Sequence, residues 1–311
     1  MEAWIWIPIT FLAAFMQAAR TAGQKHLTKD FSAVGASYVR FLWGLPFALA
    51  YLWFLKQHGG HAWPDAEWRF FIFSVLAGLS QIAATILLVF LFSLRNFAIG
   101  STYARTEALL TAIVGAFVFH EALAGAGWLA VVMGAMGVVI INLARTGTGG
   151  GTGGGIGGDT LVRRLFQPAA GVGLLAGLGF AGASLFLRQA SLSLGLDDWL
   201  YAAALTLAMV LVIQTVVMSV YILFRARDQI SAMAPNWKGC LFVGITSVVG
   251  SAGWFTAITI ERAAYVKALG QVELLFTLAL SVLYFKERST PKELMGMGMV
   301  AGSIVVLLLF G

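Results

Sequence analysis

The chain has 311 residues, of which 59% are hydrophobic and 11% are charged, and its formal net charge is +6. Soluble domains carry about 25% charged residues, so this composition excludes an ordinary soluble protein and favours a polytopic membrane protein. The Lys and Arg residues lie almost entirely between apolar runs, where membrane topology explains them better than a nucleic-acid partner does. The single cysteine, Cys240, excludes an internal disulfide.

Apolar runs of membrane-spanning length follow one another along the chain, and each predicts a transmembrane helix. In the first part the runs cover residues 3–22, 34–55, 70–94, 97–119 and 122–143. In the second part they cover residues 169–187, 199–224, 239–260, 263–285 and 294–310. The tenth run follows Thr290-Pro291-Lys292-Glu293, a capping box with proline at the first helical position, which predicts a helix start there. We therefore predict an all-α polytopic membrane protein with ten transmembrane helices.

A stretch that is nearly all Gly and Thr, from Thr146 to Gly158, separates the two groups of runs. Its composition is typical of a flexible linker. We assign residues 1–145 to a first five-helix repeat, residues 146–167 to the Gly-rich linker and residues 168–311 to a second five-helix repeat. Because five is an odd number, the two repeats must insert with opposite orientations. We therefore expect two inverted repeats, an arrangement typical of transporters.

Identical residues recur in the two halves at one constant offset. Glu107 and Glu273 are the most informative pair, because each lies inside an apolar run, where an ionisable side chain is costly and marks a functional site by default. The recurring pairs are Ala98/Ala264, Glu107/Glu273, Leu109/Leu275, Thr111/Thr277, Phe119/Phe285, Glu121/Glu287, Val139/Val305 and Leu143/Leu309.

At these residues the chain resembles the drug/metabolite transporter (DMT) superfamily in its ten-helix EamA form. Members of that family carry a Glu in helices four and nine and a second Glu two heptads later, as Glu107 with Glu121 and Glu273 with Glu287 do. In the family, a Gly-rich fifth or tenth helix follows the second Glu. The resemblance covers nearly the whole chain.

Three basic residues, Lys25, Arg40 and Arg188, look like the family's basic positions at the end of the first helix of each half and in helix two. The chain departs from the family where Ala108 and Leu274 follow the mid-helix glutamates, because the family usually has proline there. The resemblance implies a transporter that needs no cofactor.

Polar and aromatic side chains inside the runs are the candidates for substrate binding or proton coupling, and a buried carboxylate suits either role. Alternatively, the glutamates form structural ion pairs, for which Arg20, Arg40, Arg105 and Lys267 are the potential counter-charges; structural pairing is the favoured role for Arg40. Glu121 and Glu287 are expected to cap the helices that follow them. The candidate site residues are Glu107, Glu273, Tyr103, Arg40, Gln271, Gln81 and Trp254.

We expect a secondary transporter, acting as an exporter of a small polar or amphipathic metabolite such as an amino acid or amine, by alternating access around a central cavity. Helices one to four and six to nine should surround this cavity, with helices five and ten outside. The expected setting is the inner (plasma) membrane, as a monomer or homodimer. The alternative is a membrane-embedded enzyme or a lipid flippase acting on a lipid-linked substrate. No histidine pair has metal-ligand spacing, so no metal is expected.

Two arguments disagree on topology. The loops after odd-numbered helices carry most of the Lys and Arg residues, which places the linker in the cytoplasm and both termini outside. The family resemblance implies that both termini are cytoplasmic. Both arguments place the two termini on the same side of the membrane.

Overall fold

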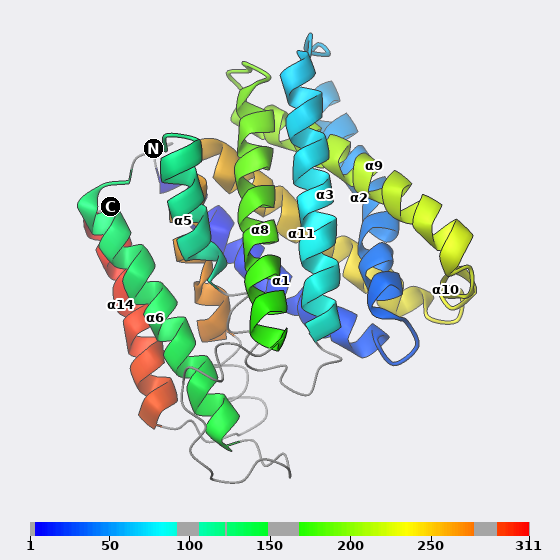
Figure 1. Cartoon of the computed structure of the whole chain (residues 1–311). Helices are drawn as coiled ribbons and strands as arrows, with labels where there is room; N and C mark the ends of the chain where they lie inside the picture. The colour runs from blue at the N-terminus through cyan, green and yellow to red at the C-terminus, as the bar shows by residue number, and fades with distance from the viewer. Residues whose placement is uncertain (1–3, 92–105, 122, 149–167, 277–290, 311) are drawn as a thin grey trace.

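The computed structural model describes residues 4–91, 106–121, 123–148, 168–276 and 291–310. Within these ranges the regular secondary structure is entirely helical, as expected (Figure 1). The helices are α1 (Trp6–Leu27), α2 (Ala33–Gly59), α3 (Trp68–Leu91), α5 (Glu107–Val118), α6 (Gly125–Thr148), α8 (Pro168–Leu192), α9 (Trp199–Arg225), α10 (Asp228–Ser231), α11 (Trp237–Ile260), α12 (Ala263–Gly270) and α14 (Pro291–Phe310).

Local sequence sets several helix ends. Ser32 caps α2, since its hydroxyl oxygen accepts a hydrogen bond from the Gly35 N–H at 3.1 Å. That helix ends before Gly60, whose φ of 63° lies in the left-handed region that glycine adopts without strain. Asp198 caps α9 in the same manner as Ser32 caps α2. α14 is described from Pro291 onward, and Thr290, the residue predicted to cap it, lies outside the described residues.

Among the described residues, five helices are long and apolar enough to cross a membrane, by length and composition: α2, α9, α11 and the apolar parts of α3 and α8. Shorter apolar helices occur at Glu107–Val118, Gly125–Ile140 and Leu294–Phe310. The predicted fourth and ninth spans lie partly outside the described residues, and so does most of the predicted linker, although α6 continues to Thr148. A multi-pass helical protein is thus confirmed, whereas the number of ten spans stays a prediction.

Equivalent helices of the two halves pack in equivalent pairs. The first half contributes α1, α2, α3, α5 and α6 in order, and the second contributes α8, α9, α11, α12 and α14. The third helix of each half packs on the first helix of the other, as α3 with α8 and α11 with α1. The second helices, α2 and α9, pack together, and so do the fifth helices, α6 and α14, which lie side by side at one edge (Figure 1). This pattern is what a two-fold relation between the halves requires, while their opposite orientation in the bilayer stays a prediction.

Small residues allow the closest of these contacts. A Cβ atom on Gly137 of α6 would lie 2.8 Å from the backbone oxygen of Gly296 in α14. A Cβ atom on Gly253 of α11 would lie 2.9 Å from the Cβ of Ala13 in α1. Membrane helices associate through such close backbone approach, because lipid removes most of the hydrophobic driving force between them.

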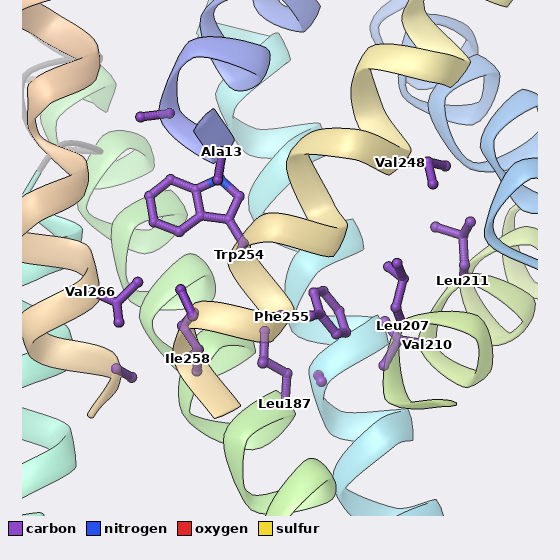
Figure 2. Packing of buried hydrophobic residues seen from close by; sticks show 14 of the residues in the cluster. Ala13, Leu187, Leu207, Val210, Leu211, Val248, Trp254, Phe255, Ile258 and Val266 are labelled. Carbon is purple, nitrogen blue, oxygen red and sulfur yellow. The ribbon is translucent and has the colours of Figure 1, made fainter. Parts of the chain in front are cut away.

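The buried apolar core extends through both halves and reaches the centre of the molecule along α11. Figure 2 shows Phe255 of α11 directed towards Leu207 and Val210 of α9, and Trp254 directed the other way, towards α1 and α12.

Candidate functional site

A cavity of about 200 Å³ lies between helices of both halves. From the first half α1, α2, α3, α5 and α6 contribute lining residues, and from the second half α8, α11, α12 and the residues after α12 do so. Because one water needs roughly 10–15 Å³ in this measure, the cavity has room for on the order of fifteen water-sized groups. A single small metabolite would fill it.

Six of the seven candidate site residues line this cavity, and they come from α2, α3, α5, α11 and the segment that follows α12. The seventh, Tyr103, lies outside the described residues. The fold therefore brings polar side chains from distant parts of the sequence to one place. The six are Arg40, Gln81, Glu107, Trp254, Gln271 and Glu273.

The helices around the cavity differ from expectation in two places. Within the described residues, α9 contributes nothing to the lining, whereas α6, expected to lie outside, contributes Val138. α9 packs against α2, α3 and α11. Its Gln214 contacts a residue of the cavity lining, since Gln214 Nε2 donates a hydrogen bond to Gln81 Oε1 at 2.6 Å. Sequence reasoning missed Gln214, although a glutamine inside the apolar run 199–224 was a usable signal.

Glu107 lies in the first turn of α5 and forms an ion pair with Lys267 of α12, with 2.6 Å between Glu107 Oε1 and Lys267 Nζ. The two side chains are 20% and 14% exposed, respectively. Lys267 Nζ also lies 4.5 Å from the ring centroid of Trp254, which adds a cation–π contact. The counter-charge of Glu107 is thus Lys267 and not Arg40. The reason is tertiary: α12 packs directly against α5.

Glu273 is 5% exposed and accepts a hydrogen bond from Gln17 of α1, with 2.9 Å between Gln17 Nε2 and Glu273 Oε2. Arg20, one turn further along α1, interacts electrostatically with both Glu273 and Glu107. The repeated carboxylates are therefore both in contact with side chains from the opposite half of the chain.

Arg40 of α2 lines the same cavity but differs from the other charged groups. It is 3% exposed, and its Nε has no hydrogen-bond partner within the described ranges. Among the described residues, Arg20, whose charge has the same sign, acts on it electrostatically. The expected structural pairing of Arg40 with a glutamate is therefore absent among the described residues, because Lys267 and Gln17 occupy the two carboxylates instead.

The predicted ninth run is interrupted at the cavity. α12 ends at Gly270, Gln271 follows as its C-cap, and residues 272–276 are helical again. A Cβ atom on Gly270 would lie 2.3 Å from Cη2 of Trp254, so only glycine lets the indole approach this closely. In the part of the chain that the structure describes, the side-chain amide of Gln271 has no hydrogen-bond partner on either atom.

Glu121 does not act as a cap in the described structure. Its Oε1 lies 3.1 Å from Nε of Arg188 in α8. The same guanidinium donates to backbone carbonyls at the end of α11, those of Ile258, Thr259 and Glu261. Arg188 thus joins the end of α5 to the end of α11. Glu287, the repeat counterpart of Glu121, lies outside the described residues.

Among the described residues no group of three or more His, Cys, Asp or Glu side chains is placed to hold a metal ion. The groups that the cavity lining offers to a ligand are therefore the Glu107–Lys267 ion pair, the Glu273 carboxylate, two guanidinium groups, side-chain amides and an indole. This set is suited to binding a polar molecule through complementary charges and hydrogen bonds.

Comparisons with known proteins agree with this fold. A solved structure described as "Crystal structure of protein" matches with a TM-score of 0.71 at 15% identity, covering 98% of this chain and 96% of that one. At that identity the match shows the fold alone. No curated protein sequence matches the chain. A sequence profile of the EamA-like transporter family matches twice, over residues 4–143 and 167–309, which together span most of the chain. The chain therefore belongs to the EamA-like transporter family, whose members are membrane transporters of the DMT type.

Proposed function

We propose that the chain is a secondary transporter that exports a small polar or amphipathic metabolite across the inner (plasma) membrane by alternating access around the cavity. The observation that carries the proposal is the charged cavity itself, which is lined from both halves and has the Glu107–Lys267 ion pair in its lining. A substrate that binds there contacts both halves at once. It can therefore couple its own binding to their relative movement.

The size and polarity of the cavity favour a small solute over a lipid-linked substrate. About 200 Å³ accommodates a molecule of amino-acid size, while a lipid-linked molecule would need a larger site that opens to the bilayer. The charged lining would bind polar groups that carry charge or hydrogen-bonding atoms. The membrane-embedded enzyme and the lipid flippase are therefore the weaker alternatives.

The test is a counterflow assay with purified protein in liposomes. Vesicles loaded with one unlabelled amino acid or amine at a time are diluted into the same labelled compound, and wild-type protein is compared with Glu107→Gln. We expect transient accumulation of at least one compound with wild-type protein and at least a tenfold slower rate with the variant. Glu67→Gln, which neutralises an exposed glutamate before α3, is the matched control and should behave as wild type.

Export is tested separately in cells. Expression should lower the internal concentration of the transported compound, and Glu107→Gln should abolish that effect. Turnover of a lipid-linked substrate by detergent-solubilised protein, with no flux in vesicles, would instead establish the enzyme alternative.

A further inference from the structure

Among the described residues, Arg40 is a buried charge without a counter-ion. It lines the cavity, is 3% exposed and has an Nε without a hydrogen-bond partner. Its aromatic neighbour within cation–π range, the ring of Phe41, lies 5.3 Å from its Cζ and belongs to the adjacent residue. Such a contact does not replace a carboxylate, and a guanidinium this deeply buried is normally paired.

The carboxylates that could pair with Arg40 are already engaged. Glu107 is bonded to Lys267, and Glu273 accepts from Gln17 and interacts with Arg20. Among the described lining residues there are three basic groups, Arg20, Arg40 and Lys267, against these two acidic ones. The described lining therefore has an excess of one positive charge.

Two further residues that line the cavity carry buried hydrogen-bond donors without partners in the described part of the chain. The Nε2 of Gln271 and the indole Nε1 of Trp254 have no acceptor there, and the two side chains are 7% and 8% exposed. Buried donors are nearly always paired in proteins, so unpaired donors that line one cavity indicate an acceptor that binds there. A ligand with a negatively charged oxygen group would satisfy both the donors and the charge excess.

We propose that Arg40 binds a carboxylate of the transported metabolite, so that the substrate is a small carboxylate and not a simple amine. This inference rests on the proposed function. A guanidinium binds a carboxylate through two parallel hydrogen bonds, a geometry that an ammonium group cannot reproduce. A single excess positive charge matches one carboxylate better than a doubly charged phosphate. The neighbouring apolar side chains Phe180, Phe255 and Leu88 would contact the remainder of the molecule.

The experiment measures ligand-dependent thermal stabilisation of purified protein in detergent. The probes are leucine, phenylalanine and 3-phenylpropionate, the corresponding amides, the amines isoamylamine and phenethylamine, and inorganic phosphate. We expect at least one carboxylate to raise the melting temperature saturably while its amide and amine leave it unchanged. The apparent affinity should fall at least tenfold in Arg40→Gln and recover in part in Arg40→Lys. Arg69→Gln, at an exposed position, is the matched control and should retain wild-type affinity.

A second variant separates binding from a structural role. Because Arg40 has no counter-ion among the described residues, Arg40→Met should melt at or above the wild-type temperature without ligand and should show no carboxylate response. A markedly lower melting temperature of Arg40→Met would mean that Arg40 is a structural group and would overturn the proposal.

The proposal would also be overturned if an amide or amine stabilised the protein as much as the carboxylate, or if no carboxylate stabilised it. Wild-type affinity in Arg40→Gln would overturn it, and so would saturation by phosphate at a lower concentration than by every carboxylate. Vesicle counterflow of the same compounds separates this inference from the proposed function. Flux of an amine alone would uphold transport and refute carboxylate binding. Saturable carboxylate binding without flux would uphold carboxylate binding and refute transport.

Discussion

Glu107 of the first half and Lys267 of the second half form an ion pair, with Glu107 Oε1 and Lys267 Nζ 2.6 Å apart at the edge of the cavity. The pair joins α5 to α12, which belong to the predicted fourth and ninth spans, the equivalent spans of the two halves. In the proposed alternating access one half moves against the other, so a bond between them reports on their relative position. It also limits which single substitutions the protein tolerates.

Glu107→Gln should destabilise the protein, because it leaves the Lys267 ammonium partly buried without its carboxylate. Breaking a fully buried pair costs about 3–5 kcal/mol; since both side chains here retain some exposure, we expect about 1–3 kcal/mol. Thermal unfolding in detergent measures the loss. The double variant Glu107→Gln/Lys267→Met should recover part of it, since no charge is then stranded. Equal melting temperatures for the wild type and Glu107→Gln would contradict the pairing.

Gly270→Ala should be poorly tolerated. The added Cβ would lie 2.3 Å from Cη2 of Trp254, so the indole or the helix must shift, at a cost of about 1–3 kcal/mol. Gly298→Ala in α14 is the matched control, because a Cβ atom there would meet no described atom within 4 Å. Adding Trp254→Phe, a smaller ring, should restore stability to Gly270→Ala. If Gly270→Ala and Gly298→Ala melt alike, the close approach of Trp254 does not exist in solution.

Arg188→Gln should lower stability by about 2–4 kcal/mol, since it strands the Glu121 carboxylate and frees the carbonyls at the end of α11. Glu121→Gln should cost less, about 1 kcal/mol, because the amide oxygen still accepts from the guanidinium. Chemical or thermal unfolding compares the two with Arg225→Gln, which alters an exposed arginine at the end of α9 and should be near neutral. The prediction fails if Arg188→Gln is no more destabilising than Arg225→Gln.

Successive loops should be reached from opposite sides of the membrane. Asp30 follows α1 and Asp65 follows α2, and both are exposed. In a Cys240→Ala background, a membrane-impermeant thiol reagent applied to intact cells should label Asp65→Cys but not Asp30→Cys, if the positive-inside rule sets the orientation. Labelling of Asp30→Cys alone would establish the orientation that the family resemblance implies. Labelling of both would contradict α2 as a membrane span.

Composition and periodicity are sufficient to predict the helical membrane class, because long apolar runs have few structural solutions in a bilayer. The two-repeat family assignment follows from identities at one offset. An ionisable residue is conspicuous within an apolar run, because placing it in a membrane is costly. Glu107, Glu273 and Arg40 are therefore recognisable as candidate site residues in the amino-acid sequence itself.

Only the tertiary structure decides which charges meet. In the sequence Arg20, Arg40, Arg105 and Lys267 are all potential partners for Glu107, with structural pairing favoured for Arg40. The packing of α12 on α5 selects Lys267. The same packing leaves Arg40 without a carboxylate among the described residues, and the break at Gln271 and the contact of Trp254 with Gly270 also depend on it. Side-chain pairing between helices depends on distance and direction in space. A one-dimensional pattern specifies the face of a helix, but it does not specify the neighbour that the face will meet.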